Sequence, residues 1–223
     1  MRRCALIKAG LVDYDYGLSL QADARRLVSD GKFDGALILA EHLPVITTGR
    51  GGGLENLRAD ENRLPDQGVQ VISSDRGGNI TCHNPGQLVG YPVMNLKQWQ
   101  QDVHWYVETL EEVLIRALAG LGLRAGRKAK YTGVWIGNEK IAAIGVSVRQ
   151  WITGHGFAMN VNNSLDIFRS VIPCGISEFG VTSITKEGLD VNMEQAAAFA
   201  VKEFCGLFDC SAEEVMAPAA NQK

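Results

Sequence analysis

Hydrophobic residues recur at helical spacing in three stretches of the chain. The longest stripe follows Asp102, a predicted N-cap, and consists of Val103, Tyr106, Val107, Leu110, Val113, Leu114, Ala117, Leu118 and Leu121. Intervals of three and four residues predict an amphipathic helix, which Gly120 and Gly122 should end. Shorter stripes predict a helix around residues 20–28, ended by Gly31, and a last helix over about residues 193–207.

The stretches between these helices are short and rich in apolar or β-branched residues, which is typical of strands. Strands are predicted at residues 3–9, 36–40, 45–48, 69–73, 79–83 and 87–93. Residues 131–161 predict an antiparallel meander, with turns at 138–139 and near 153–154. The pattern therefore predicts one α+β domain of mixed and antiparallel sheets with flanking helices over residues 1–216, and a disordered tail at 217–223.

Composition and charge narrow the class of protein. The 223 residues carry 22 Lys and Arg against 25 Asp and Glu, a net charge of −3, which argues against a protein that mainly binds nucleic acid or an anionic membrane. Neither a membrane helix nor a signal peptide fits the sequence, so a cytoplasmic location is expected. Five cysteines without a CxxC pair suit reduced thiols, and four histidines without ligand spacing argue against a metal site.

Glycine is enriched, with 25 residues, and it clusters beside reactive or charged side chains. Three such segments stand out, at residues 75–87, 140–145 and 173–176. In the second, KIAAIG, small residues along a strand leave room for something to lie against the backbone. Close packing of a helix on the sheet would explain the same residues equally well.

Cys174, between Pro173 and Gly175, is the thiol that a fixed turn would present, although a free cysteine is more often a buried hydrophobic residue. Lys140 opens a predicted strand, and its ammonium either ends in solvent or lies beside a thiol, lowering its pKa or taking its proton. Cys82 and His83 are neighbours on a strand, so their side chains should point to opposite faces.

Together, three ordered blocks carry a family resemblance. They are RGGNITCHNPGQLVGYPVMNL, GVWIGNEKIAAIGVSVRQWITGHGFAMNV, and IPCGI followed by VTSI. In this order they resemble the octanoyl-acyl-carrier-protein:protein N-octanoyltransferase family, also called lipoyl(octanoyl) transferases. With the glycine turn at residues 49–51, the resemblance extends over nearly the whole chain.

The resemblance implies a fold like that of biotin and lipoate ligases, with a core related to class II aminoacyl-tRNA synthetases. It implies ATP-independent transfer of an octanoyl or lipoyl group from acyl carrier protein to a lysine ε-amino group, the first step of endogenous protein lipoylation. The implied acceptors are apo lipoyl domains of 2-oxoacid dehydrogenase complexes or the glycine cleavage H protein. A cytoplasmic monomer without cofactor, metal, nucleic acid or membrane is expected.

The resemblance also implies roles for individual residues. Cys174 of PCGI would carry the acyl thioester and Lys140 of KIAAIG would activate it. The residues expected to line the substrate site are Arg76, Gly77, Gly78, Asn79, Ile80, Thr81, Cys82, His83, Ala143, Ile144, Gly145, Gly156, Phe157 and Ala158.

In two positions this chain departs from the family pattern. The usual motif is TYHGPGQ, and here Cys82 replaces the tyrosine and Asn84 the first glycine. Loss of the tyrosine ring is expected to widen or repolarise the wall of the acyl pocket.

Three other functions compete with this interpretation. A lipoate or biotin ligase would form an acyl-adenylate from ATP and would not need Cys174. A thiol hydrolase would use Cys174 with His83 or His155, and a non-catalytic acyl-binding module would use no thiol at all.

Overall fold

The computed structural model describes residues 1–59, 64–172 and 179–217. The helices are α1 (Tyr14–Ser29), α2 (Val103–Gly120) and α3 (Met193–Phe208), with short 3₁₀ turns η1 (Leu54–Asn56), η3 (Pro65–Gln67), η4 (Leu96–Gln98) and η5 (Asp166–Ser170). The strands are β1 (Arg2–Val12), β2 (Gly35–His42), β3 (Val45–Thr48), β4 (Gln70–Ser73), β5 (Thr81–His83), β6 (Gln87–Met94), β7 (Gly126–Lys128), β8 (Tyr131–Ile136), β9 (Glu139–Arg149), β10 (Ile152–Asn160), β11 (Gly180–Val181) and β12 (Cys210–Glu214).

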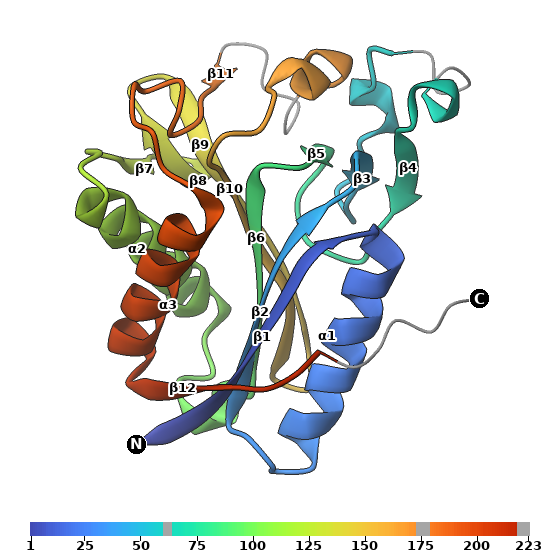
Figure 1. The fold of residues 1–223 in the computed structure, drawn as a ribbon. Helices are drawn as coiled ribbons and strands as arrows, with labels where there is room; N and C mark the ends of the chain where they lie inside the picture. The colour runs from blue at the N-terminus through green and yellow to red at the C-terminus, as the bar shows by residue number, and fades with distance from the viewer. Residues whose placement is uncertain (60–63, 173–178, 218–223) are drawn as a thin grey trace.

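A large mixed sheet forms the centre of the molecule (Figure 1). Its strand order is β12-β1-β2-β6-β10-β9-β8-β7, and β11 pairs with β9. The strands β12, β1 and β2 are parallel to one another. The neighbours in the rest of the order, β2-β6-β10-β9-β8-β7, pair in antiparallel fashion. A second sheet has the order β4-β3-β5. Two glycine-rich segments adjoin it: residues 49–53 follow β3, and residues 75–79 lie between β4 and β5.

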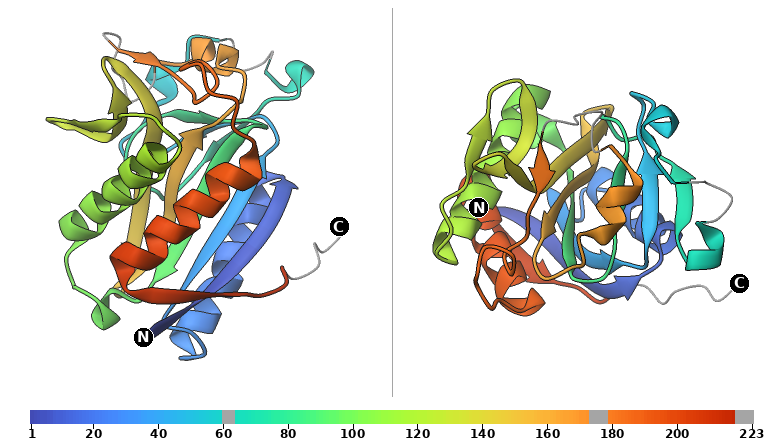
Figure 2. Two further views of the ribbon diagram at one scale, coloured as in Figure 1. Left: turned by 60° about the vertical axis from the view of Figure 1, so that its left-hand side comes forward. Right: turned by 90° about the horizontal axis from the view of Figure 1, so that it is seen from above.

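Helices cover both faces of the large sheet. The helices α2 and α3 lie side by side on one face and α1 on the other, as Figures 1 and 2 show. The larger core lies under α2 and α3 and includes Tyr106, Leu110 and Phe204, while Leu20 and Ala24 of α1 pack into a smaller core on the opposite face. The helix stripes expected from the sequence are therefore the faces that contact the sheet.

The predicted class and most predicted elements are confirmed, including the N-cap at Asp102. The turn predicted near 153–154 is wrong, because the chain reverses at Gln150 and Trp151, which have φ of 53° and 67°. Two consecutive positive φ angles make the tight hairpin, yet neither residue is the glycine or asparagine that would signal it. The sequence also did not predict β12, which pairs in parallel with the first strand.

In the part of the chain that the structure describes, no helix combines the length and apolar character needed to cross a membrane.

The N-cap of α2 allows a simple test of the fold. The Oδ1 atom of Asp102 accepts hydrogen bonds from the backbone N–H groups of His104 (2.8 Å) and Trp105 (3.2 Å). We expect Asp102→Ala to lower the free energy of unfolding by about 1 kcal/mol, because these donors lose their partner. Urea denaturation measures the change, with the exposed Gln101→Ala as control. Equal stability of the two variants would contradict a role for the cap.

Candidate functional site

Two glycine-rich segments lie against each other beside the small sheet. The backbone N–H groups of Gly49, Arg50 and Gly51 donate to the carbonyls of Asn79 (3.1 Å), Arg76 (2.9 Å) and Gly78 (2.9 Å), respectively. A Cβ on Gly51 would lie 2.9 Å from the Gly78 oxygen, and one on Gly49 would collide with the same atom. Both glycines are needed here because the backbones approach too closely for side chains.

Residues 75–79, the roof loop, also lie directly on strand β9. The N–H of Gly77 donates to the carbonyl of Val146 at 2.8 Å. A Cβ on Gly145 would lie 3.0 Å from the Gly77 oxygen and 3.2 Å from Cδ of Arg76. The small residue in KIAAIG therefore leaves room for a loop of the same chain.

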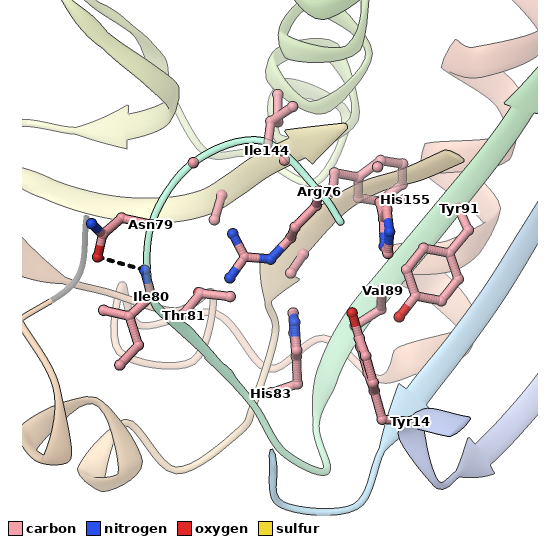
Figure 3. Close-up of a pocket in the computed structure, with 16 residues that line it drawn as sticks. Tyr14, Arg76, Asn79, Ile80, Thr81, His83, Val89, Tyr91, Ile144 and His155 are labelled. Carbon is pink, nitrogen blue, oxygen red and sulfur yellow. Dashed lines mark hydrogen bonds between the residues drawn. The ribbon is translucent and has the colours of Figure 1, made fainter. Parts of the chain in front are cut away.

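A cavity lies beneath the roof loop, between it and strands β6, β9 and β10 (Figure 3). It is narrow, with a volume of about 60 Å³. Its lining consists of Tyr14, Arg76, Gly78, Asn79, Ile80, Thr81, His83, Val89, Tyr91, Ala143, Ile144, Gly145, His155, Gly156, Phe157 and Ala158.

Most of the residues expected at the substrate site converge on this cavity. Arg76, the residues from Gly78 to Thr81, His83, Ala143 to Gly145 and Gly156 to Ala158 all contribute to its lining. Gly77 and Cys82 do not. Whether the lining binds a substrate remains a prediction, but three segments that are distant in sequence form one wall.

The side chain of Cys82 points away from the cavity. It is fully buried in a further hydrophobic cluster beside the small sheet, which also contains Ile46, Leu64 and Phe168. Its thiol lies 3.6 Å from the Ile167 carbonyl, and burial raises the pKa of the thiol to about 12. Cys82 therefore does not line this cavity, because strand alternation turns its side chain toward the core, and the effect of losing the tyrosine ring on the acyl pocket stays a prediction.

One end of the cavity, the inner end, is formed by polar aromatic rings. Tyr14, His83 and Tyr91 line it, and His42 lies behind them within 6 Å between ring centroids. His42 Nδ1 lies 3.1 Å from the Val12 carbonyl, and its Nε2 lies 2.7 Å from the Tyr91 hydroxyl. Since a carbonyl only accepts, Nδ1 carries the proton and the Tyr91 hydroxyl donates to Nε2.

His83 is likewise held in one tautomer. Its Nδ1 donates to Gln87 Oε1 at 2.7 Å, while the Gln87 amide donates to Cys82 O and Asn160 Oδ1. Burial lowers the pKa of His83 to about 3, and burial also lowers the pKa of His42. Both histidines are neutral at physiological pH, so they make the inner end polar without adding charge to it.

The roof loop is anchored at its start by hydrogen bonds to the Asp75 carboxylate. His155 Nε2 donates to Asp75 Oδ1 at 2.7 Å, and Arg149 donates to Asp75 Oδ2 at 3.0 Å. The hydrogen bond from His155 lowers the pKa of Asp75, whereas burial lowers the pKa of His155. His155 has φ of 55°, in the left-handed region, and its ring contacts the loop through this bond to Asp75.

Arg76 is a buried cation within this lining. Its Nη2 donates to the carbonyl (2.7 Å) and hydroxyl (2.9 Å) of Thr47, and its Nη1 donates to the Gly77 carbonyl at 3.2 Å. These bonds connect the roof loop to strand β3. Arg76 therefore holds the loop in place as well as lining the cavity.

Lys140 lies outside this cavity, in a wide groove walled by α2, β7, β8 and the roof loop. It is buried, with its Nζ 3.2 Å from the Thr132 carbonyl and 4.7 Å from the centre of the Trp135 ring. A Cβ on Gly133 would lie 3.4 Å from its Cε. The lysine does not extend into solvent, and its ammonium is held by a carbonyl and an aromatic face.

Helix α2 supports the strand that holds Lys140. Glu111, which is 6% exposed, accepts hydrogen bonds from Gly133 N–H (2.9 Å) and from Arg127 Nε (3.0 Å). Arg127 also donates to the Glu108 carbonyl and pairs with Glu112. Glu111 thus fixes the residue next to Thr132, and the charge of Arg127 is offset by two carboxylates.

The groove and the cavity meet at Gly78, Asn79, Ile144 and Gly145, which line both. The groove reaches Lys140, whereas the inner end with Tyr14 and Tyr91 belongs to the cavity alone. A chain entering from the groove would therefore reach these rings last. Cys174 lies outside the described residues.

Among the described residues, four that line the cavity were not predicted from the sequence: Tyr14, Val89, Tyr91 and His155. Tyr14 begins a helix and Val89 and Tyr91 lie within an apolar strand, so each resembles an ordinary core position. Local motifs gave no signal for them, because only the folded sheet places α1 beside the roof loop.

Known proteins resemble this chain in sequence. Residues 13–205 match the family model described as the lipoyl protein ligase A/B catalytic domain. The octanoyltransferase of Thermoanaerobacter sp. (strain X514) is 45% identical over 216 residues, which cover 96% of this chain and 94% of that relative.

Two solved structures show the same fold at low sequence identity. The bi-partite lipoate protein ligase of Thermoplasma acidophilum has a TM-score of 0.78 at 19% identity, covering 97% of this chain and 88% of that one. The biotin protein ligase of Aquifex aeolicus in complex with biotin and ATP has a TM-score of 0.53 at 13% identity, covering 94% and 71%. The expected biotin and lipoate ligase-like fold is confirmed.

The buried neutral His83 predicts a pH dependence of stability. Its folded pKa of about 3 lies below its ordinary value of 6.5, so the unfolded chain binds the proton more readily. Its contribution is complete above pH 6.5 and is lost as the pH falls toward 3, by about 2 kcal/mol at pH 5. We expect His83→Gln to lose less stability than the wild type between pH 7 and pH 5 in urea denaturation.

The exposed His104→Gln serves as control and should follow the wild-type pH dependence. Identical slopes for His83→Gln and wild type would contradict a neutral, buried His83.

Proposed function

This chain belongs to the lipoyl protein ligase A/B catalytic domain family, among its octanoyltransferases, and we propose that it transfers an octanoyl group from acyl carrier protein to a lysine of a lipoyl domain. The enzyme is an acyltransferase. The observation that carries the proposal is the junction of a narrow cavity with a groove that holds a buried lysine.

The shape of the cavity suits an unbranched acyl chain. Its lining includes the apolar residues Ile80, Ala143, Ile144 and Phe157, which suit a hydrocarbon chain. Burying each CH₂ of such a chain contributes roughly 0.8 kcal/mol to binding. The carbonyl end would remain at Gly78 and Gly145, where the groove begins.

The proposed reaction has two acyl exchanges. The Cys174 thiolate attacks the carrier thioester, the carrier thiolate leaves and takes up a proton, and an enzyme thioester is formed. The lysine amine of the acceptor then attacks that thioester, forms the amide and releases the Cys174 thiol, which accounts for the proton lost by the amine. Both steps start from a thioester, so neither requires ATP.

Lys140 is proposed to favour the thiolate. A thiol of ordinary pKa, about 8.5, is only a few per cent ionised at pH 7, and a nearby ammonium stabilises the anion. The Thr132 carbonyl and the Trp135 ring hold Lys140 in a buried position, which makes its charge more effective than it would be in water.

The described chain that follows residue 178 supports this pairing. Phe179, five residues after Cys174, packs on Trp135 with ring centres 5.4 Å apart, and Val181 is the β-partner of Lys140. These contacts connect the described chain from Phe179 onward to the strand that holds Lys140, which supports the proposal that Cys174 and Lys140 act together.

The groove also offers the path for both protein partners. Relatives of this fold include a ligase studied with its E2 lipoyl domain, which supports a lipoyl domain as acceptor. Lys128 and Lys130 line the groove and would attract an acidic carrier protein. Arg127 is less suited to that role because Glu111 and Glu112 already bind its guanidinium.

One experiment separates this function from the competing ones. The protein is incubated with octanoyl-acyl carrier protein without nucleotide, and its intact mass is measured before and after addition of an apo lipoyl domain. An octanoyl adduct that moves to the domain supports the transferase. An adduct that is lost to water indicates a thiol hydrolase, and transfer that requires ATP and free octanoate indicates a ligase; both results contradict the proposal, as does the absence of any adduct.

Cys174→Ala is expected to abolish the octanoyl adduct and the transfer to the lipoyl domain, because no other residue would form the thioester. The control is Cys82→Ala, which removes a thiol directed away from the cavity and should keep the adduct. Intact mass spectrometry of both variants after incubation with the donor gives the answer. Near wild-type transfer by Cys174→Ala would disprove the nucleophile.

Lys140→Met is expected to raise the pKa of the Cys174 thiol and to slow acylation by ~10²–10⁴-fold. The rate of Cys174 alkylation by iodoacetamide, measured against pH, reports the thiol pKa directly. Lys202→Met, on the exposed side of α3, is the control. An unchanged alkylation profile in Lys140→Met would remove this lysine from the mechanism.

A further inference from the structure

Helix α1 has a glycine where it faces the inner end of the cavity. A Cβ on Gly17 would lie 2.7 Å from Cε1 and 3.3 Å from Nε2 of His42, closer than real side chains allow. The backbone of Gly17 is otherwise helical, a conformation in which alanine is the more favourable residue. The missing side chain therefore provides space for the His42 ring.

The His42 ring has no freedom to move elsewhere. It is fully buried, and both nitrogens are engaged, one with the Val12 carbonyl and one with the Tyr91 hydroxyl. Tyr14 and His83 contact its ring on the cavity side, with centroids 5.4 and 5.9 Å away. Pressure on His42 from α1 would consequently be transmitted to the rings that line the cavity.

These rings are the far wall for a chain that enters from the groove. Figure 3 shows Tyr14, His83 and Tyr91 on the opposite side of the cavity from Ile144 and Asn79. Ile144 and Asn79 also line the groove that reaches Lys140, whereas the three rings do not. The terminal methyl of a bound acyl chain would face Tyr91 and Tyr14.

We propose that Gly17 determines the length of the acyl chain by setting how far His42, and with it Tyr91, stands back from the cavity. This inference rests on the proposed function. A wall supported from behind by a hydrogen-bonded ring and a helix backbone cannot retreat when a longer chain arrives. Adding one methyl group behind the wall should therefore shorten the accepted chain by about one to two CH₂ groups.

The test compares Gly17→Ala with Gly206→Ala in the full-length protein. Gly206 also lies within a helix, α3, but a Cβ there would meet no atom within 4 Å. Values of kcat/KM are measured with hexanoyl, octanoyl and decanoyl thioesters of acyl carrier protein. We expect the hexanoyl-to-octanoyl ratio to rise about tenfold in Gly17→Ala and to stay at the wild-type value in Gly206→Ala.

The ratio does not depend on the fraction of protein that folds, so a destabilised variant still gives an answer. A second variant, Gly17→Ala with His42→Ala, removes the ring that the new methyl group displaces and should return the ratio toward the wild-type value. If the wild type accepts these donors but the hexanoyl-to-octanoyl ratio of Gly17→Ala equals that of the wild type, the role of Gly17 is wrong and the proposed function stands. Failure of the wild type to accept any of the three donors would overturn the proposed function, and this inference with it.

Discussion

The contact between the roof loop and strand β9 is the constraint on which the site depends. The hydrogen bond from Gly77 to Val146 forms only because Gly145 has no side chain to hold the loop away. The same loop is held by Arg76 bound to Thr47 and by Asp75 bound to His155. The small residues of β9 and the charged residues of the roof loop together leave a narrow space between the backbone of the loop and that of the strand. Large apolar side chains would fill this space.

The inner end of that space shows how a fold can bury polar rings without charge. His42 and His83 each donate from one nitrogen to a fixed acceptor, and burial keeps both of them neutral. A buried network of this kind is rigid because every displaced ring leaves a partner without its hydrogen bond. Rigidity at this end is what a chain-length limit requires.

The lysine at the other end is positioned by the main helix of the core. Glu111, on the buried side of α2, binds the Gly133 amide, and the neighbouring Thr132 carbonyl binds Lys140. The carboxylate is tied in turn to Arg127 on β7. The packing of α2 on the sheet and the position of the Lys140 ammonium are thus linked by two hydrogen bonds, through the backbone of Thr132 and Gly133.

Local patterns in the sequence determined the helices, most strands, the cap at Asp102 and the motifs that identify the family. Helical spacing and capping involve residues close along the chain, so they can be recognised without the fold. The tertiary structure decided the hairpin at Gln150–Trp151 and the pairing of β12 with β1. Neither feature has a local sequence signal, because both depend on how strands pair. Only the tertiary structure directed Cys82 into the core and brought Tyr14 and Tyr91 to the cavity. The reason is that strand register and helix placement, rather than residue type, decide whether a side chain points into the core or into the cavity.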